Sequence, residues 1–175
     1  MRVNVGRISR EKGGQLELEL EERFAPLETP AGMISFTKPV AVTGVVTNTG
    51  KCLFVQGTIR TEAELVCDRC LEKFRRALEV PFEMEFFRQT GEESGEERTF
   101  LQEAGGLYRG EEFDLTEPVR EEISLALPMQ NLCRDTCAGL CERCGANLNL
   151  TQCNCDHTVV DPRLAGLEEW LKRNS

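Results

Sequence analysis

The chain has 175 residues, a formal net charge of −9, 40% apolar residues and nine cysteines. This length fits one domain with a small appendage, and the apolar content is enough for a hydrophobic core. No apolar run approaches the roughly 18 residues of a membrane span and no signal peptide follows Met1, so we expect a soluble, cytoplasmic protein without a membrane partner. Because an acidic chain is repelled by a polyanion, a general nucleic-acid coat protein is disfavoured.

The first fifty residues show the alternation that is typical of antiparallel strands. Residues 3–8 predict a short opening strand, and Leu alternates with Glu over residues 16–21, as in a half-buried strand. Residues 26–32 contain two prolines and predict a connection. Residues 40–47 are rich in β-branched side chains and predict a strand, which ends at a turn over residues 48–50.

The clearest strand pattern lies on both sides of Cys67 and Cys70. Apolar and polar residues alternate from Leu53 to Cys67, and the alternation resumes from Leu78 to Phe86. Successive side chains of a strand point to opposite faces, so the two stretches predict a long antiparallel hairpin with one solvated face. Cys67 and Cys70 then lie at the tip of this hairpin.

A loop and two helices complete the predicted elements. The acidic, apolar-poor stretch around residues 91–97 predicts a mobile loop over about residues 89–110. A capping-box pattern at Asp114 predicts a helix that ends at Pro128 and packs on the sheet. Asp161 and Pro162 predict the start of a closing helix. Its apolar stripe either docks on the protein or faces a partner; the stripe contains Leu164, Leu167 and Leu171, with Trp170 beside it.

Eight of the nine cysteines form four close pairs: Cys67 and Cys70, Cys133 and Cys137, Cys141 and Cys144, and Cys153 and Cys155. Two thiolates on one tight turn suit a tetrahedral Zn²⁺, and Gly145 permits the positive φ with which the backbone turns over the metal. Disulfides and a thioredoxin-type redox pair are the alternatives. A cytosolic chain keeps its thiols reduced, and neither Cys-x-x-Cys opens a helix after a buried strand, so the pattern favours structural zinc.

The economical grouping of these thiols gives two sites. One contains Cys67, Cys70, Cys133 and Cys137, and the other contains Cys141, Cys144, Cys153 and Cys155. An interleaved grouping, in which Cys137 joins the second site, is also possible, and His157 is an alternative ligand. Two such sites would change the net charge to about −13. Cys52 is interpreted as an ordinary core residue.

No set of residues indicates an enzyme. The chain has one histidine and lacks the glycine-rich and nucleophile motifs of common enzyme classes, so we expect neither catalysis nor a small-molecule substrate. One basic cluster surrounds the hairpin tip. Its members are either cross-strand partners of glutamates or contacts to RNA or a protein partner; they are Arg69, Lys73, Arg75 and Arg76.

Several segments resemble those of the YceD-like family, the large ribosomal RNA subunit accumulation proteins of bacteria and plastids. The segments are C-D-R-C-L at residues 67–71, L-A-L-P at 125–128, C-A-G-L-C-E-R-C-G-A-N-L-N at 137–149, C-N-C at 153–155 and D-P-R at 161–163. The resemblance spans about residues 53–171. It implies a role in the synthesis, processing or stability of 23S ribosomal RNA.

The sequence therefore predicts an α+β protein with two parts. Residues 1–130 form an antiparallel sheet with a long hairpin and a packed helix, and residues 131–175 form a cysteine-rich zinc segment with a second helix. The functional hypothesis is a non-enzymatic ribosome-biogenesis factor whose partner is 23S rRNA or its precursor, contacted directly or through a ribosomal or processing protein. The alternative is a zinc-stabilised adaptor that binds such a protein and does not touch RNA.

Overall fold

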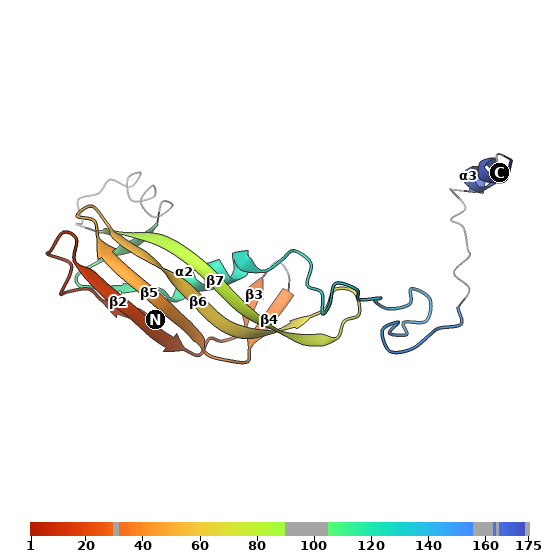
Figure 1. Ribbon diagram of the computed structural model, residues 1–175, viewed down its shortest axis with the longest axis horizontal. Helices are drawn as coiled ribbons and strands as arrows, with labels where there is room; N and C mark the ends of the chain where they lie inside the picture. The colour runs from red at the N-terminus through yellow and green to blue at the C-terminus, as the bar shows by residue number, and fades with distance from the viewer. Residues whose placement is uncertain (30–31, 90–104, 156–162, 164, 174–175) are drawn as a thin grey trace.

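The computed structural model describes residues 1–29, 32–89, 105–155, 163 and 165–173. Its main feature is a twisted antiparallel sheet (Figure 1). Four strands lie side by side in it, in the order β2 (Gln15–Glu22), β5 (Val40–Asn48), β6 (Leu53–Val66) and β7 (Lys73–Arg88). β6 and β7 are the longest, with 14 and 16 residues, and they pair from Leu53 opposite Phe86 to Val66 opposite Lys73. This pairing confirms the long hairpin that the alternation predicted.

Within the described residues, five short strands complete the β-structure. They are β1 (Arg2–Asn4), β3 (Leu27–Thr29), β4 (Gly32–Phe36), β8 (Gly106–Tyr108) and β9 (Glu112–Asp114). β3 and β4 form an antiparallel pair that joins β6 near its end, β8 runs parallel to the end of β7, and β1 pairs with β9. We call these nine strands, together with the helix that packs on them, the sheet body.

Two expectations about connections were wrong in part. Residues 26–32 were expected to be a connection, but Leu27–Thr29 and Gly32–Phe36 are strands, because the apolar side chain of Ile34 is buried there, 1% exposed. The predicted loop over residues 89–110 includes β8, in which Tyr108 is buried. Residues 90–104 of that loop lie outside the described residues.

The core lies on one face of the sheet and is closed by a helix. Side chains at alternate positions of β5, β6 and β7, such as Val42, Ile59 and Val80, lie opposite one another and are buried. Helix α2 (Thr116–Ala126) buries Val119 and Ile123, which share one helical face with the buried Leu127. Burying one face of the sheet and one stripe of the helix stabilises both elements.

Helix α2 begins one residue later than the capping-box pattern predicted. Its N-cap is Leu115, and Asp114 lies just before the helix. The Asp114 carboxylate nevertheless accepts a hydrogen bond at 2.8 Å from the backbone N–H of Thr116. The prediction was therefore correct that the Asp114 carboxylate accepts a hydrogen bond from the start of the helix, and wrong that Asp114 is the N-cap residue.

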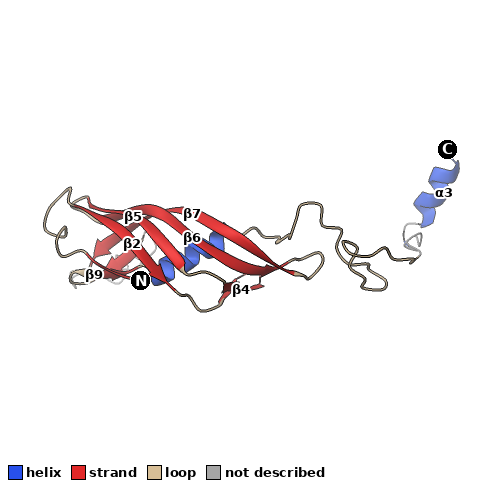
Figure 2. Ribbon diagram, turned by 60° about the horizontal axis from the view of Figure 1, so that its bottom comes forward, coloured by secondary structure: helices blue, strands red, loops and turns tan. Residues whose placement is uncertain are grey.

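Only one helix belongs to the sheet body, which corrects the expected fold of a sheet with two helices. The closing helix, α3 (Ala165–Arg173), lies away from the sheet in both views (Figures 1 and 2), and its predicted start at Asp161 lies outside the described residues. The side chains of Leu167, Trp170 and Leu171 are 58–59% exposed. Among the described residues, neither helix has the length and apolar character that a membrane crossing requires.

Candidate metal sites

The first candidate site is built at the tip of the β6–β7 hairpin. β6 ends at Val66, so the chain turns through Cys67 and Cys70 before β7 begins at Lys73. The backbone N–H of Leu71 donates to the carbonyl oxygen of Cys67 at 2.8 Å, and Leu71 has a φ of +59°. This tight turn points both thiols to the same side.

The segment that follows α2 returns to this tip. The backbone N–H of Asp68 donates to the Asn131 carbonyl oxygen at 2.8 Å, and the Asn131 N–H donates to Oδ2 of Asp68 at 2.6 Å. Asn131 is 1% exposed and Asp68 is exposed, so the two hydrogen bonds are shielded from water on the Asn131 side only. They place the next residues, including Cys133 and Cys137, over the hairpin tip.

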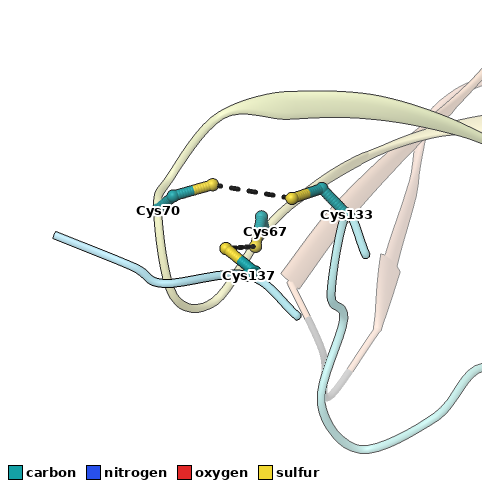
Figure 3. Close-up of side chains that lie close together, drawn as sticks. All are labelled: Cys67, Cys70, Cys133 and Cys137. Carbon is teal, nitrogen blue, oxygen red and sulfur yellow. Dashed lines mark hydrogen bonds between the residues drawn. The ribbon is translucent and has the colours of Figure 1, made fainter. Parts of the chain in front are cut away.

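Four thiols meet at this point (Figure 3). We call Cys67, Cys70, Cys133 and Cys137 the clamp site, because they join the hairpin tip to the returning segment. The Sγ atoms of Cys67 and Cys137 are 3.8 Å apart, as are those of Cys70 and Cys133, and all four lie within 4.8 Å of one another. Sulfur atoms about 2.3 Å from a tetrahedral Zn²⁺ are about 3.8 Å from one another, so this spacing fits such an ion.

The second candidate site is local in sequence. We call Cys141, Cys144, Cys153 and Cys155 the terminal site; their Sγ atoms also lie within 4.8 Å of one another. Its first turn repeats the geometry of the hairpin tip, because the Gly145 N–H donates to the Cys141 carbonyl oxygen at 2.8 Å and Gly145 has a φ of +71°. The eight cysteines are thus brought together in the economical grouping, and Cys137 does not join the second group.

The two sites differ in their burial. In the clamp site Cys67, Cys70 and Cys137 are at most 4% exposed and form a small cluster with Phe74, Leu132 and Leu140. In the terminal site only Cys141 is buried, and Cys144 is exposed. A buried thiolate is costly unless it is paired with a cation, so the clamp site makes the stronger demand for a metal.

The thiols of the clamp site are not equivalent. Burial opposes ionisation of Cys67, but backbone N–H groups of Cys133, Cys70 and Arg69 outweigh it and lower the pKa of Cys67 to about 6. Burial and the neighbouring thiols of Cys137 and Cys67 raise the pKa of Cys133 to about 12. Four negative charges cannot share this volume without a cation, so a bound metal would complete the ionisation.

The thiols of the terminal site also differ in their pKa. Hydrogen bonds from the backbone N–H groups of Cys144 and Arg143 lower the pKa of Cys141 to about 6. The Cys144 thiol, together with burial, raises the pKa of Cys155 to about 12. The clamp site thus has lowered pKa values at Cys67 and Cys137 and raised ones at Cys70 and Cys133, and the terminal site has a lowered pKa at Cys141 and a raised one at Cys155.

The four donor atoms of each group suit a structural metal site and not a catalytic one. Each site offers four sulfur donors, which would fill a tetrahedral coordination shell and leave no position for a reacting water. Soft thiolates suit Zn²⁺ among the common cations. His157, the alternative ligand, lies outside the described residues. Cys52 is buried near a turn, where its sulfur lies 3.3 Å from Oγ1 of Thr49, and it belongs to neither group.

Three members of the basic cluster at the hairpin tip interact with other residues of the protein, and the fourth, Arg76, lies opposite Ala63 in the β6–β7 register. Arg69 donates to the Cys137 carbonyl oxygen at 3.1 Å, and Lys73 pairs with Glu64 at 2.8 Å. Arg75 lies directly opposite Glu64 in the β6–β7 register, and its charge helps to lower the pKa of Glu64, after the larger effect of Lys73. Contact of this cluster with RNA or another protein stays a prediction.

Asparagines were the site residues that the sequence analysis did not single out. Asn149 hydrogen-bonds to the Cys137 sulfur at 3.3 Å, and Asn131 holds the returning segment at Asp68. The available signal was their place in the short segments that lead to or join the cysteine pairs, since asparagine favours turns and satisfies backbone groups there.

The sheet body and the two thiol groups define a class of protein: a small β-rich chain with two groups of four cysteines, each of which could hold a metal ion. The family described as large ribosomal RNA subunit accumulation protein YceD matches residues 55–171. The chain belongs to this family, as the resemblance in the sequence indicated.

Relatives show how far the similarity extends. An uncharacterized protein of Mycobacterium tuberculosis is 28% identical over 173 residues, which cover 98% of this chain and 81% of the relative. The chloroplastic large ribosomal RNA subunit accumulation protein YCED homolog 1 is similar in two plants. The protein from Zea mays is 29% identical over 67% of this chain and 48% of its own length, and that from Arabidopsis thaliana is 27% identical over 70% and 46%. No solved structure matches the chain significantly.

Proposed function

We propose that this protein is a non-enzymatic factor in biogenesis of the large ribosomal subunit, and that it supports the synthesis, processing or stability of 23S rRNA in the cytoplasm. The observation that carries the proposal is the family match over residues 55–171, whose description refers to accumulation of the large ribosomal RNA subunit. Two plant relatives carry the same description.

Two structural Zn²⁺ ions are part of the proposal. The clamp site and the terminal site each offer four thiols at tetrahedral spacing, and such sites contribute directly to folding. All-sulfur sites support a scaffolding role, because they have no open coordination position at which a substrate is activated. The metal-bound segment would then present a fixed surface to a partner.

Depletion of the protein in its source cell tests the proposed role. We expect the ratio of mature 23S rRNA to 16S rRNA to fall, and expression of the wild-type chain from a second locus to restore it. A ratio that stays unchanged at complete depletion contradicts the proposal. Loss of both RNAs in parallel also contradicts it, because that result indicates a general growth defect.

A specific observation favours a second candidate, an adaptor that binds a ribosomal or processing protein. Helix α3 exposes Leu167, Trp170 and Leu171, and contiguous exposed apolar side chains are typical of protein-binding surfaces. Crosslinking in the cell separates the candidates. RNA crosslinks at Arg75 or Arg76 support direct contact with RNA, whereas protein crosslinks at Leu167 without RNA crosslinks support the adaptor.

A further inference from the structure

The two thiol sites are joined by one side chain. Asn149 lies in the loop between Cys144 and Cys153, so its position depends on the terminal site. Its side chain nevertheless reaches the clamp site: Nδ2 donates to the Cys137 sulfur at 3.3 Å, and Oδ1 accepts from the Ala138 N–H at 2.8 Å. The amide thus contacts one cysteine of the other site and the backbone directly after it.

Further hydrogen bonds fix the orientation of this amide. Arg134, which lies between Cys133 and Cys137, donates to Oδ1 of Asn149 at 2.7 Å. Oδ1 of Asn147 accepts from the backbone N–H of Asn149 at 3.0 Å and from its Nδ2 at 2.9 Å. The side chain therefore uses both its acceptor and its donors, and it has one orientation that satisfies them all.

The backbone around Asn149 follows the same path between the two sites. The Leu148 N–H donates to the Gly139 carbonyl oxygen at 2.9 Å, and the Leu140 N–H donates to the Arg69 carbonyl oxygen at 3.1 Å. Gly139 has a φ of +77°, and a Cβ there would lie 3.1 Å from the Arg69 carbonyl oxygen. The hairpin tip, the segment after Cys137 and the Asn149 loop are consequently in direct contact.

We infer that Asn149 is a positioning residue that couples the two metal sites, so that closure of the terminal site strengthens the hold of the clamp site on its metal. The inference rests on the structural-zinc part of the proposed function. An N–H···S hydrogen bond stabilises a metal-bound thiolate, and loss of such an outer contact typically weakens metal affinity about 10- to 100-fold. Because thermodynamic coupling is reciprocal, an intact clamp site also strengthens the terminal site.

Four variants of the full chain, purified with zinc and compared with the wild-type chain, test the coupling. Asn149→Asp keeps an acceptor for Ala138 and Arg134 but removes the donor to Cys137. Asn149→Ala removes both. Gln152→Ala is the matched control, because Gln152 is an exposed amide residue in the same loop. The fourth form, Cys144→Ser with Cys155→Ser, opens the terminal site without changing a clamp-site ligand.

The measurement is the rate at which a chromophoric chelator removes zinc from the clamp site. Native mass spectrometry counts the remaining ions, and alkylation of Cys137 reports on the clamp site separately. We expect Asn149→Asp and the double-serine form each to accelerate this loss about tenfold or more, and Gln152→Ala to leave it unchanged. A variant that combines Asn149→Asp with the double-serine change should lose zinc from the clamp site little faster than either variant alone. Both changes act through the same hydrogen bond.

Two results would overturn the inference, and they can be told apart. One result is a wild-type chain that holds two ions, with zinc lost from the clamp site equally fast in the wild type and all variants, or with fully additive effects of Asn149→Asp and the double-serine change on that rate. The coupling is then absent, and the proposed function is unaffected. If the wild-type chain purified with zinc holds no ion, the structural-zinc part of the proposed function fails, and the coupling fails with it.

Discussion

At the scale of single residues, the two Cys-x-x-Cys turns have the same backbone geometry but different residues after the second cysteine. In both turns the residue after the second cysteine has positive φ and donates its N–H to the carbonyl oxygen of the first cysteine at 2.8 Å. Gly145 adopts this conformation without steric cost, whereas Leu71 places a Cβ against its own backbone. Leu71 is also 64% exposed, so burial of its side chain offsets little of that cost.

This difference predicts that Leu71→Gly stabilises the protein. We expect a gain of about 0.5–1 kcal/mol in the free energy of unfolding, because glycine relieves the left-handed strain at the loss of little buried surface. Chemical denaturation of the zinc-loaded chain measures it. Leu150→Gly is the control: Leu150 is 76% exposed and does not have positive φ, so the same substitution there should bring no gain. Equal effects at both positions would contradict the strain argument.

Gly145→Ala is the converse prediction. A Cβ at Gly145 would meet no atom within 4 Å, so steric crowding plays no part and only the positive φ opposes the substitution. We expect a loss of about 1 kcal/mol, measured as about fivefold weaker zinc binding at the terminal site in a chelator competition. Unchanged zinc affinity would show that this turn does not need its left-handed residue.

At the scale of the elements, the connection between β9 and α2 carries an electrostatic contribution. Burial opposes ionisation of Asp114, but hydrogen bonds from the hydroxyl and N–H of Thr116 and the charge of the Met1 amine outweigh it and lower its pKa. The same carboxylate satisfies the Thr116 N–H in the first turn of α2, which the helix itself leaves without a partner. Asp114 therefore favours the helix most when it is ionised.

Asp114→Ala is predicted to lower the free energy of unfolding by about 1 kcal/mol at neutral pH, because it removes the acceptor of the Thr116 N–H at the start of α2. The folded-state pKa lies below the unfolded value, so the electrostatic part of this contribution is present above the unfolded value, about pH 4 for an aspartate, and is lost as the pH falls through the folded-state pKa. The difference between the two proteins should shrink over that range. Asp135→Ala, at an exposed residue outside α2, serves as the control. A difference that is constant from pH 7 to pH 3 would exclude the electrostatic part.

At the scale of the whole molecule, the apolar core and the cysteine cluster are separate. The core of the sheet body contains residues of β1 to β9 and α2 but none of the eight paired cysteines. Cys67, Cys70 and Cys137 form a second, smaller cluster at the end of the hairpin. Burial of apolar surface thus stabilises the sheet body, and the returning segment depends on the hairpin tip and its thiols.

Removal of the metal is therefore predicted to loosen one part of the molecule and leave the other folded. After treatment with a chelator, we expect the β-sheet circular dichroism signal to persist while trypsin cleaves faster at the exposed Arg134 and Arg143. Added zinc should restore resistance. Cys141→Ala should hold about one ion fewer and show faster cleavage mainly at Arg143. Loss of the sheet signal together with the metal would show that the two clusters are not independent.

Local patterns in the sequence determined the long strands, the buried helix and the close pairs of cysteines, but not the short strands β3, β4 and β8. Alternation fixes which side chains of residues 53–67 and 78–86 share a face, and the burial of Ile59 and Val80 follows from it. Four cysteine pairs at short spacing likewise predict two tetrahedral sites. Strand alternation and cysteine spacing depend only on residues that are close in the sequence, so they can be recognised without knowledge of the fold.

Only the tertiary structure decided how distant segments meet. The grouping of Cys67 with Cys137 requires the segment after α2 to return to the hairpin tip, and the contacts that direct it there, between Asp68 and Asn131, join residues 63 positions apart. The bond from Asn149 to the Cys137 sulfur and the exposed position of α3 have the same origin. Such contacts depend on the shape of the assembled sheet body, and no period or spacing in the sequence encodes them.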